Sequence, residues 1–471
     1  MNSIQTVNHQ LEDFEIHMIN ETLSRRNFMR LTAGTAGLAT AGNISFLTPE
    51  FLAATPRPAV PSDRVRFASI GTGVRGCDIM RAALACPNVE VVAVCDLYDG
   101  RLTAGQEAAG KPLPATKDYR AILDRKDVDA VLAAVPDHWH RRIVEDACAA
   151  GKDVYCEKPM SHTVEDGFAM VDAMKKHQRI VQVGSQARSS IVYAKAREIY
   201  SSGSLGQVTL IEAWIDRNDA SGAWVYPIPP DANEKTVDWE RFLGSAPKRP
   251  FDLKRFFRWR CFKDYGEGLP GDLFVHLLTG MFTITGINQP PIRACSMGGQ
   301  FRWNNDGRDV ADVVWTLYEY PDFRVSIRCN QNNESPGVTR VFGTKGTLEI
   351  KNDILTVTPQ VTQPAPEGYS ILGWPEKLRK QYLAEWRKEH PAPTPGTFPL
   401  MTDAQVFKAP DNYDYTQDHF LNFFDSVRSR KPSVEDALFG NHTAIACHMA
   451  NYSLEKKTMA VWDEGSKTIK G

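Results

Sequence analysis

The feature that most constrains the fold is a glycine-rich turn, Gly71-x-Gly73-x-x-Gly76, which follows an apolar stretch over residues 64–70. Residues 78–86 then carry apolar side chains at helical spacing, so the turn joins a predicted strand to a predicted helix. In this context the first glycine permits a tight turn, the second admits a pyrophosphate, and the third allows close helix–strand packing. The pattern predicts a dinucleotide bound at the helix N-terminus. The predicted contacts in this turn are Gly71, Gly73, Val74, Arg75 and Gly76.

A second predicted strand, residues 89–95, ends in Asp96. An acidic side chain at this place can accept hydrogen bonds from the adenosine ribose and would repel a 2′-phosphate. Asp96 therefore favours NAD as the cofactor, while the nearby Arg101 leaves NADP possible.

Two further predicted strands end in polar motifs. Residues 128–135 are almost continuously apolar, as expected of a strand that is buried on both faces, and lead into Pro136-Asp137-His138-Trp139-His140. Residues 153–156 lead into Glu157-Lys158-Pro159. A lysine there lies at the carboxyl edge of the sheet, where open α/β sheets bind ligands, and the proline stiffens the chain beside it. The predicted cofactor contacts at this edge are Pro136, His140, Glu157 and Lys158.

The two histidines of the first motif could suggest a metal site. No carboxylate or cysteine lies at a suitable spacing from His138 and His140, so we predict no metal and expect His140 to lie near the nicotinamide. The nine cysteines are scattered singly, which favours buried free thiols over a disulfide or metal framework.

Beyond residue 186 the pattern changes. After a predicted helix over 189–200 and a strand over 207–217, two hairpins are predicted, 309–330 around a Tyr-Pro-Asp turn and 339–351 around Gly-Thr-Lys-Gly. Hairpins imply antiparallel strands, so the second half is predicted to be α+β with a mostly antiparallel open sheet. Amphipathic helices are expected over 418–428 and 441–456, and a proline-rich surface excursion over 363–399.

A second chemical motif follows Trp259-Arg260 and consists of Asp272-x-x-x-His276. If Asp272 opens a helix, residues four apart share a face, so the aspartate and the histidine point together. A neutral histidine can take a hydroxyl proton while a hydride leaves the same carbon. The aspartate can orient the imidazole or hold a neighbouring hydroxyl of the substrate.

Together the glycine turn, the Pro136–His140 motif, Glu157-Lys158-Pro159 and Asp272-x-x-x-His276 resemble the Gfo/Idh/MocA family of glucose–fructose oxidoreductase and inositol dehydrogenase. The resemblance implies a Rossmann domain, a second domain whose open sheet often serves oligomerisation, and NAD(P)-dependent chemistry on sugars, cyclitols or glycosides. It places Lys158 and His276 as the catalytic pair, with Asp272 beside them. It also places three residues towards the substrate: Arg188, Trp259 and Arg260. One departure is Leu269-Pro270-Gly271, where relatives often have a run of glycines.

The N-terminus resembles an export signal. Ser24-Arg25-Arg26-Asn27-Phe28-Met29 precedes an uncharged run over 31–47 that is too short and too weakly apolar for a membrane span, and a proline-rich linker ends near residue 62. We expect three regions: the twin-arginine signal and linker, 1–62; the Rossmann domain, 63–186; and the C-terminal α/β domain, 187–471. A periplasmic location follows if the signal is used, and a cytoplasmic one if it is not.

Composition describes an ordinary globular protein. With 42% hydrophobic residues, 24% charged residues and a formal net charge of −2, nothing indicates nucleic acid as a partner. The expected partners are a small carbohydrate substrate and, by the resemblance, further copies of the chain. The leading hypothesis is an NAD(P)-dependent oxidoreductase acting on a secondary alcohol. The alternatives are a redox-neutral glycosidase or lyase that passes through a keto-sugar, and a non-catalytic nucleotide-binding sensor.

Overall fold

The computed structural model describes residues 45–46, 64–360, 369–390 and 404–471. The twin-arginine motif and the linker lie outside the described residues. The chain divides into two compact units, one of residues 1–45 and 366–404, the other of residues 46–365 and 405–471. The larger unit holds two sheets and every residue of the predicted site.

The predicted parallel sheet is confirmed, with six strands in the order β4-β3-β2-β5-β6-β7. Its strands are β2 (Val65–Ile70), β3 (Val89–Cys95), β4 (Ala115–Thr116), β5 (Ala130–Ala133), β6 (Asp153–Glu157) and β7 (Val181–Gly184). Its helices are α3 (Val74–Leu84), α4 (Asp99–Ala109), α5 (Tyr119–Leu123), α6 (His140–Ala149) and α7 (Val164–His177).

Local sequence explains where these elements begin and end. Every residue of β5, β6 and β7 is buried, in keeping with a sheet covered on both faces. Thr163 caps α7, because its hydroxyl accepts a hydrogen bond from the backbone N–H of Asp166. The carboxyl ends of β2, β5 and β6 thus carry the glycine turn, the Pro136–His140 motif and Glu157-Lys158-Pro159 to one edge.

The second sheet has eleven strands in the order β1-β15-β14-β13-β12-β8-β11-β10-β9-β16-β17. Its strands are β1 (Ser45–Phe46), β8 (Val208–Asp216), β9 (Arg293–Gly299), β10 (Val313–Glu319), β11 (Arg324–Asn330), β12 (Val338–Gly343), β13 (Gly346–Lys351), β14 (Ile354–Pro359), β15 (Gln405–Lys408), β16 (Ala460–Asp463) and β17 (Thr468–Lys470). Both predicted hairpins are present, as β10–β11 and β12–β13. β11 and β8 run parallel, while the other register-defined pairs are antiparallel.

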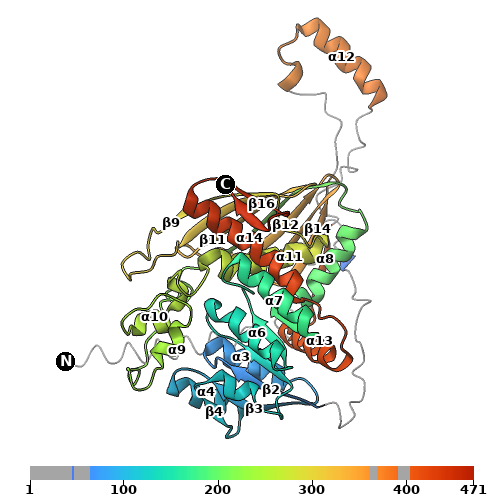
Figure 1. Cartoon of the computed structure of the whole chain (residues 1–471). Coiled ribbons are helices and arrows are strands. Elements are labelled where there is room, and N and C mark those ends of the chain that lie inside the picture. The colour runs from blue at the N-terminus through green and yellow to red at the C-terminus, as the bar shows by residue number, and fades with distance from the viewer. Residues whose placement is uncertain (1–44, 47–63, 361–368, 391–403) are drawn as a thin grey trace, which may run out of the picture. The chain divides into compact units, whose positions relative to one another are not determined.

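Helices cover one face of this sheet (Figure 1): α8 (Ile191–Ser201), α11 (Val275–Thr285) and α14 (Ala437–Lys456). A further helix, α13 (Tyr415–Ser429), packs instead against α3 of the parallel sheet. Its buried phenylalanines, Phe420, Phe423 and Phe424, share a cluster with Phe67 and Tyr155. The C-terminal part of the chain therefore contributes to the core of the nucleotide-binding half.

The smaller unit contains α12 (Glu376–Glu389), which falls within the predicted excursion over 363–399. None of the side chains of α12 is buried. The rest of that excursion lies mostly outside the described residues.

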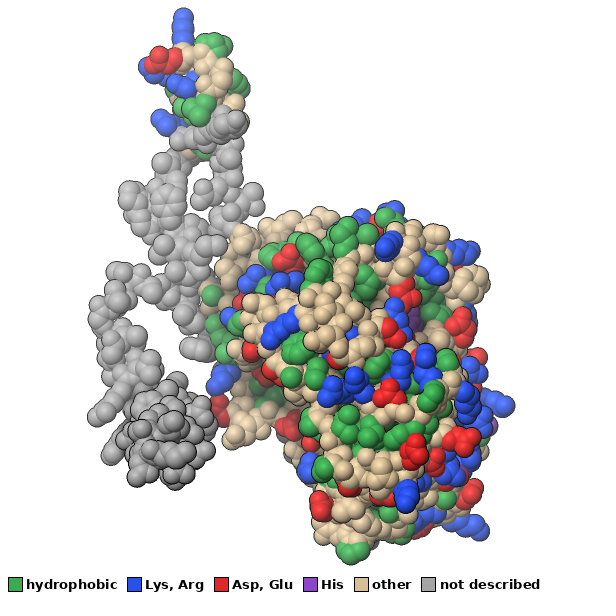
Figure 2. Space-filling model, turned by 90° about the vertical axis from the view of Figure 1, so that its left-hand side faces the viewer, with side chains coloured by type: hydrophobic (Ala, Val, Ile, Leu, Met, Phe, Trp, Pro, Cys, Tyr) green, Lys and Arg blue, Asp and Glu red, His purple; other side chains and the backbone are tan. Residues whose placement is uncertain are grey.

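The described residues include no helix that is long and apolar enough to cross a bilayer, and no cluster of His, Cys, Asp and Glu that could hold a metal ion. All nine cysteines are free thiols, and all but Cys295 are buried. On the face shown in Figure 2, Lys and Arg side chains are interspersed with Asp and Glu side chains. This mixture agrees with the net charge of −2.

Candidate active site

A cavity of about 770 Å³ lies against the carboxyl edge of the parallel sheet. Its walls come from the glycine turn, from the ends of β3, β5 and β6, from the residues that follow β8, and from the start of the helix that contains His276. Thirteen of the fifteen residues predicted for the site line it: Gly71, Gly73, Val74, Arg75, Gly76, Asp96, Pro136, Glu157, Lys158, Trp259, Arg260, Asp272 and His276.

The glycine turn has the conformation that the motif predicts. Gly71 adopts φ of +88°, and a Cβ on Gly71 would lie 2.2 Å from the carbonyl oxygen of Ala134. A Cβ on Gly76 would lie 1.9 Å from the carbonyl oxygen of Gly71, so only glycine lets α3 start this close to β2. By contrast, a Cβ on Gly73 would meet only the side chain of Arg101, at 3.5 Å.

These features fit a dinucleotide. The first backbone N–H groups of α3 have no intrahelical acceptor, so they can hold phosphate oxygens at the positive end of the helix dipole. Val74, the first residue of α3, is 84% exposed, so the helix N-terminus is open to the cavity. A pyrophosphate needs free N–H groups and space beside the turn. The exposed N-terminus of α3 and the unfilled space at Gly73 provide both.

Asp96 lies at the end of β3 and is almost fully buried. Its Oδ2 accepts a hydrogen bond from the backbone N–H of Thr72 at 2.9 Å, and its Oδ1 accepts one from the N–H of Tyr98 at 3.1 Å. A carboxylate can accept about four hydrogen bonds, so capacity remains for a ribose hydroxyl. Asp96 thus fixes the glycine turn as well as lining the cavity.

Lys158, Asp272 and Arg260 form one charged group. The Nζ of Lys158 donates to Asp272 twice, to Oδ1 at 2.9 Å and to the backbone oxygen at 2.7 Å. The Nε of Arg260 donates to the same Oδ1 at 3.0 Å. Burial alone would raise the pKa of Asp272, but Lys158 and Arg260 outweigh it and hold that pKa well below its usual range. Asp272 is therefore ionised and positions both cations.

His276 lies in the first turn of α11. Burial, together with the positive charge of Lys158, lowers the pKa of this imidazole to about 3. At neutral pH the ring is uncharged, so one nitrogen has a free lone pair that can accept a hydrogen bond from a substrate hydroxyl. No hydrogen bond joins His276 to another side chain of the described residues, and the ring lines the cavity.

The predicted helix start at Asp272 differs in the structure. Asp272 lies inside a π-helical turn, η5 (Pro270–Phe274), which leads directly into α11. The carboxylate still faces the cavity with His276, but the wider turn rather than ordinary i,i+4 spacing sets their relation.

The loop before η5 is held by buried acids. The Oδ2 of Asp137 accepts from the backbone N–H of Glu267 at 3.1 Å, and burial raises the pKa of Asp137 to about 7. The Oε2 of Glu267 accepts from Nδ1 of His448 at 3.0 Å and from Asn451 at 2.9 Å. These bonds fix the loop that carries Asp272.

Glu157 links the helix that follows the glycine turn to the strand end that carries Lys158. Its Oε1 accepts from Nε of Arg75 at 2.9 Å and from Gln186 at 3.2 Å, and the carboxylate is almost fully buried. Burial opposes the charge of Arg75, but Glu157 raises the pKa of Arg75 above its ordinary value. Arg75 is therefore a fixed cation beside the N-terminus of α3.

Two predicted site residues are not brought to the cavity. His140 is fully buried, with Nδ1 2.8 Å from the carbonyl oxygen of Pro159 and Nε2 3.0 Å from that of Val135. Here it ties the end of β5 to the lysine-bearing turn. Arg188 donates to the carbonyl oxygen of Val434 at 3.1 Å and lies 4.6 Å from the ring centre of Phe439, so it anchors the segment before α14.

Two parts of the cavity were not predicted from the sequence. The first consists of Arg217 and Tyr226, which both line the cavity. The signal for Arg217 was its place as the last residue of the strand predicted over 207–217, since polar residues at strand ends often serve sites. The second part is a long connection, residues 218–262, which we call the strap.

The strap joins β8 to the loop that carries Asp272, and it packs against Tyr98 and Arg101, which follow β3 and lie at the part of the cavity where the adenosine of a dinucleotide is expected. It includes α9 (Trp239–Leu243) and α10 (Leu253–Phe257). Tyr98 forms an isolated β-bridge with Val237, and its hydroxyl donates to Asp231 at 2.6 Å. The guanidinium of Arg101 lies 5.2 and 5.0 Å from the ring centres of Phe256 and Phe257.

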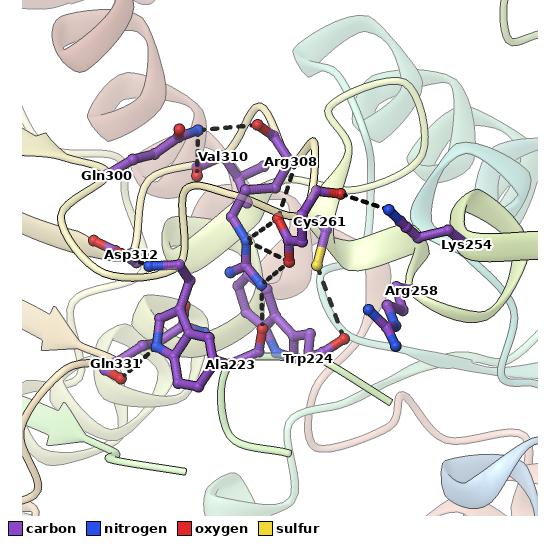
Figure 3. Close-up of polar contacts among 12 residues, drawn as sticks. Ala223, Trp224, Lys254, Arg258, Cys261, Gln300, Arg308, Val310, Asp312 and Gln331 are labelled. Carbon is purple, nitrogen blue, oxygen red and sulfur yellow. Dashed lines mark hydrogen bonds and ion pairs between the residues drawn. The ribbon is translucent and has the colours of Figure 1, made fainter. Parts of the chain in front are cut away.

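The other side of the strap is anchored to the second domain (Figure 3). The fully buried guanidinium of Arg308 donates to the carbonyl oxygen of Ala223 at 2.8 Å and pairs with Asp306 at 2.7 Å. The Sγ of Cys261 donates to the carbonyl oxygen of Trp224 at 3.8 Å, a weak contact. The strap is thus held at both domains, across the cavity.

Comparison with known proteins agrees with this architecture. Residues 65–185 match the family described as oxidoreductase family, NAD-binding Rossmann fold (GFO_IDH_MocA), and residues 235–349 match the GFO/IDH/MocA C-terminal domain. Together the two matches span about half of the chain.

Curated relatives match over a shorter region. Inositol 2-dehydrogenase of Salmonella paratyphi B is 33% identical over 144 residues, which are 30% of this chain and 43% of the relative. A glycosyl hydrolase family 109 protein of Shewanella baltica is 31% identical over 176 residues, which are 33% of this chain and 38% of the relative. The chain therefore spans less than half the length of these relatives.

Solved structures share the fold along most of the chain. Levoglucosan dehydrogenase in complex with NADH and levoglucosan gives a TM-score of 0.62 at 18% identity, covering 84% of this chain and 98% of that one. Aldose-aldose oxidoreductase from Caulobacter crescentus, complexed with glycerol, gives 0.60 at 18% identity, covering 84% and 99%. At this identity the likeness shows the fold alone.

Proposed function

Because the chain belongs to the Gfo/Idh/MocA family of oxidoreductases with a Rossmann domain, we propose that it moves a hydride between a secondary alcohol of a carbohydrate or cyclitol and a nicotinamide dinucleotide. The observation that carries the proposal is the meeting of Lys158, Asp272 and a neutral His276 in the cavity that the glycine turn also lines. A protein that only sensed a nucleotide would need the glycine turn but not this group.

The bound nicotinamide would accept or donate the hydride, and side chains of the protein would accept or return the hydroxyl proton. His276 takes the proton of the substrate hydroxyl, because its imidazole is uncharged at neutral pH. Lys158 donates a hydrogen bond to the reacting oxygen and stabilises negative charge there. Asp272 keeps the lysine and Arg260 in place through Oδ1. Trp259 and Arg260 give the substrate ring an aromatic and a cationic wall.

NAD is the preferred cofactor in this proposal. Asp96 lies where the adenosine ribose is expected, and its buried carboxylate would repel a 2′-phosphate. Arg101 lies close by, but its guanidinium is stacked over Phe256 and Phe257. We expect calorimetry to give a dissociation constant at least tenfold lower for NAD than for NADP, and an equal or reversed preference would contradict this assignment.

A redox-neutral cycle is the second candidate. The strap closes the adenosine side of the cavity from both domains, so a bound dinucleotide would leave slowly and could be reduced and reoxidised in place. Oxidation of a glycoside to a keto-sugar acidifies a neighbouring carbon, permits elimination of the aglycone, and ends with return of the hydride. The match to a glycosyl hydrolase family 109 protein supports this route.

One experiment separates these functions. The purified protein is mixed with free sugars, cyclitols and glycosides, with and without added NAD. Absorbance of the nicotinamide is followed, and the products are identified by mass spectrometry. NADH with a product two hydrogens lighter establishes the dehydrogenase. Cleavage of a glycoside without net NADH establishes the redox-neutral cycle. If neither occurs with nucleotide bound, the oxidoreductase proposal fails and a sensor remains.

We also propose that the chain forms homo-oligomers through the uncovered face of the eleven-stranded sheet. Side chains there alternate with buried ones along β9 and β10, and Met297, Trp315 and Leu317 are 75%, 54% and 54% exposed. Neighbouring apolar side chains of this size on a sheet face are typical of an interface. Sedimentation should show an assembly that Trp315→Glu weakens, and a monomer at micromolar concentration would overturn the proposal.

Export by the twin-arginine route remains a proposal that rests on the sequence before residue 62. A fusion of residues 1–62 to a reporter that is active only outside the cytoplasm tests it. Export should stop when Arg25 and Arg26 are both replaced by lysine, and export that persists would contradict a twin-arginine signal.

A further inference from the structure

Arg217 is a cation of the cavity that the chain does not neutralise. It follows β8 directly, and its backbone N–H donates to the carbonyl oxygen of Asn330 at 2.8 Å, which fixes the start of the side chain. The side chain lines the cavity together with Tyr226, Asp272 and His276. In the part of the chain that the structure describes, its guanidinium has no hydrogen bond or ion pair.

The other cations at this end are paired. Lys158 and Arg260 both donate to Asp272, and Arg75 pairs with Glu157. Carboxylates next to Arg217 in sequence are engaged elsewhere. Asp216 accepts from Arg328 at 3.1 Å, and Asp219 accepts from the backbone N–H of Gly222 at 2.7 Å.

The catalytic end of the cavity therefore has an excess of positive charge. Among the residues that line the cavity, Lys158, Arg217 and Arg260 share one carboxylate, Asp272, and Lys158 and Arg260 bind the same oxygen atom of it. The buried Asp137 also lies near Lys158 and Arg260, but burial raises its pKa to about 7, so its negative charge is only partial at neutral pH. Arg217 is only part-buried, so water can solvate its guanidinium in the open cavity. A substrate that fills the cavity would displace this water, and a desolvated cation is costly unless an anion pairs with it. Oxidised nicotinamide would add a further positive charge on this side. A negative charge on the substrate would balance this excess.

We propose that the substrate carries a carboxylate and that Arg217 binds it, so that the substrate class is a sugar acid, such as a hexuronic acid or its glycoside. This inference rests on the proposed function and names its substrate class. The guanidinium presents two parallel N–H groups whose spacing matches the two oxygens of a planar carboxylate. The pyrophosphate of the cofactor is a less suitable partner, because the N-terminus of α3 would hold it.

The carboxylate also orients the reacting carbon. Arg217 fixes one end of the sugar while His276 and Lys158 act on a hydroxyl, so the distance between acid and hydroxyl selects which carbon is oxidised. Arg217 is then a residue that determines specificity through binding, and its loss should appear mainly in KM.

The test compares each uronic acid with its uronamide, which has nearly the same shape and no charge. Steady-state kinetics with NAD are measured for glucuronic and galacturonic pairs and for the parent hexoses. The wild-type protein should prefer the acid by roughly 10- to 150-fold in kcat/KM, the range expected for a hydrogen-bonded charge pair. Arg217→Gln should abolish the preference through KM, and Arg217→Lys should restore part of it. Arg142→Gln, which changes an exposed arginine of α6, is the matched control.

The outcomes separate this inference from the proposed function. Oxidation of neutral sugars with no preference for the acid, or a preference that survives Arg217→Gln, overturns the substrate class and leaves the oxidoreductase. If kcat/KM is higher for sugar 6-phosphates or 6-sulfates than for the uronic acids, the assignment of a carboxylate as the anion is wrong. If no sugar reacts, calorimetry of the NAD-loaded protein with glucuronate decides: binding lost in Arg217→Gln supports the inference, and no binding to the wild type overturns it.

Discussion

The protonation state of His276 can be tested without knowing the substrate, through the pH dependence of stability. A histidine in an unfolded chain has a pKa near 6.5, whereas burial and Lys158 lower the pKa of His276 to about 3 in the folded protein. Between these values the unfolded chain binds a proton that the folded protein does not. The free energy of unfolding therefore falls as pH falls from 6.5 towards 3, and the contribution is fully present above 6.5.

The magnitude follows from the size of the shift. One pKa unit corresponds to about 1.4 kcal/mol, so His276 should cost the wild type about 2 kcal/mol between pH 6.5 and pH 5. His276→Asn removes this cost. The difference between variant and wild type should therefore move by about 2 kcal/mol in favour of the variant when pH is lowered from 8 to 5. Other buried groups that titrate in this range, such as His138 and Asp137, cancel in the difference.

The assay is urea unfolding followed by tryptophan fluorescence at pH 8, 6.5 and 5, with both proteins in the same cofactor state. His177→Asn, a change at the end of α7, reports the effect of replacing an ordinary surface histidine. If the difference between His276→Asn and wild type stays within about 0.5 kcal/mol over this range, His276 is not held neutral by the fold, and its role as a ready base loses its physical basis.

Three further predictions concern the same cavity. Asp272→Asn leaves Lys158 and its partner arginine without a counter-charge, so kcat should fall by roughly 10²-fold or more and urea unfolding should show a loss of about 3–5 kcal/mol; a variant with normal kcat would contradict the positioning role. Gly76→Ala should disrupt the turn itself and lower the melting temperature without cofactor, whereas Gly73→Ala should fold normally and weaken NAD binding measured by calorimetry; equal effects of the two would refute the steric account. Tyr98→Phe removes a hydrogen bond of the strap, so stopped-flow displacement should show NAD leaving several-fold faster, while an unchanged rate would mean that the strap does not retain the cofactor.

The nucleotide-binding half could be predicted well because its rules are local. The glycine turn must connect a strand to a helix, and buried parallel strands are continuous apolar runs, so the strand at 89–95 lies where it was predicted. The hairpins of the second half were predictable for the same reason, since turn residues between alternating strands specify the pairing.

Residues whose role depends on distant chain were not predictable in this way. His140 follows a strand end, as site residues often do, yet the carbonyls of Val135 and Pro159 draw it into the interior. Arg188 follows the last parallel strand, but α14 and the segment before it return from over 200 residues away and occupy its side chain. No local pattern in the sequence reports such long-range packing.

The strap and Arg217 are the converse case: they belong to the site, but the sequence did not predict them. Nothing in the sequence of residues 218–262 indicates that it spans the cavity, because its anchors, Tyr98 and Arg308, lie in different domains. The sequence placed Arg217 only at the end of a predicted strand. It matters for the site because its guanidinium forms no ion pair among the described residues. Lack of a partner is a property of the folded surroundings and cannot be found by motif.

The positive charge at the catalytic end explains how one cavity keeps an aspartate ionised and a histidine neutral. Burial pushes the pKa of Asp272 up and that of His276 down, so burial alone would leave both groups uncharged. Lys158 and Arg260 reverse the effect on the aspartate through direct bonds to its oxygen, while the charge of Lys158 adds to the effect on the histidine. One group of cations therefore keeps the aspartate ionised and the imidazole uncharged, and the same excess of charge makes an anionic substrate the natural complement of the site.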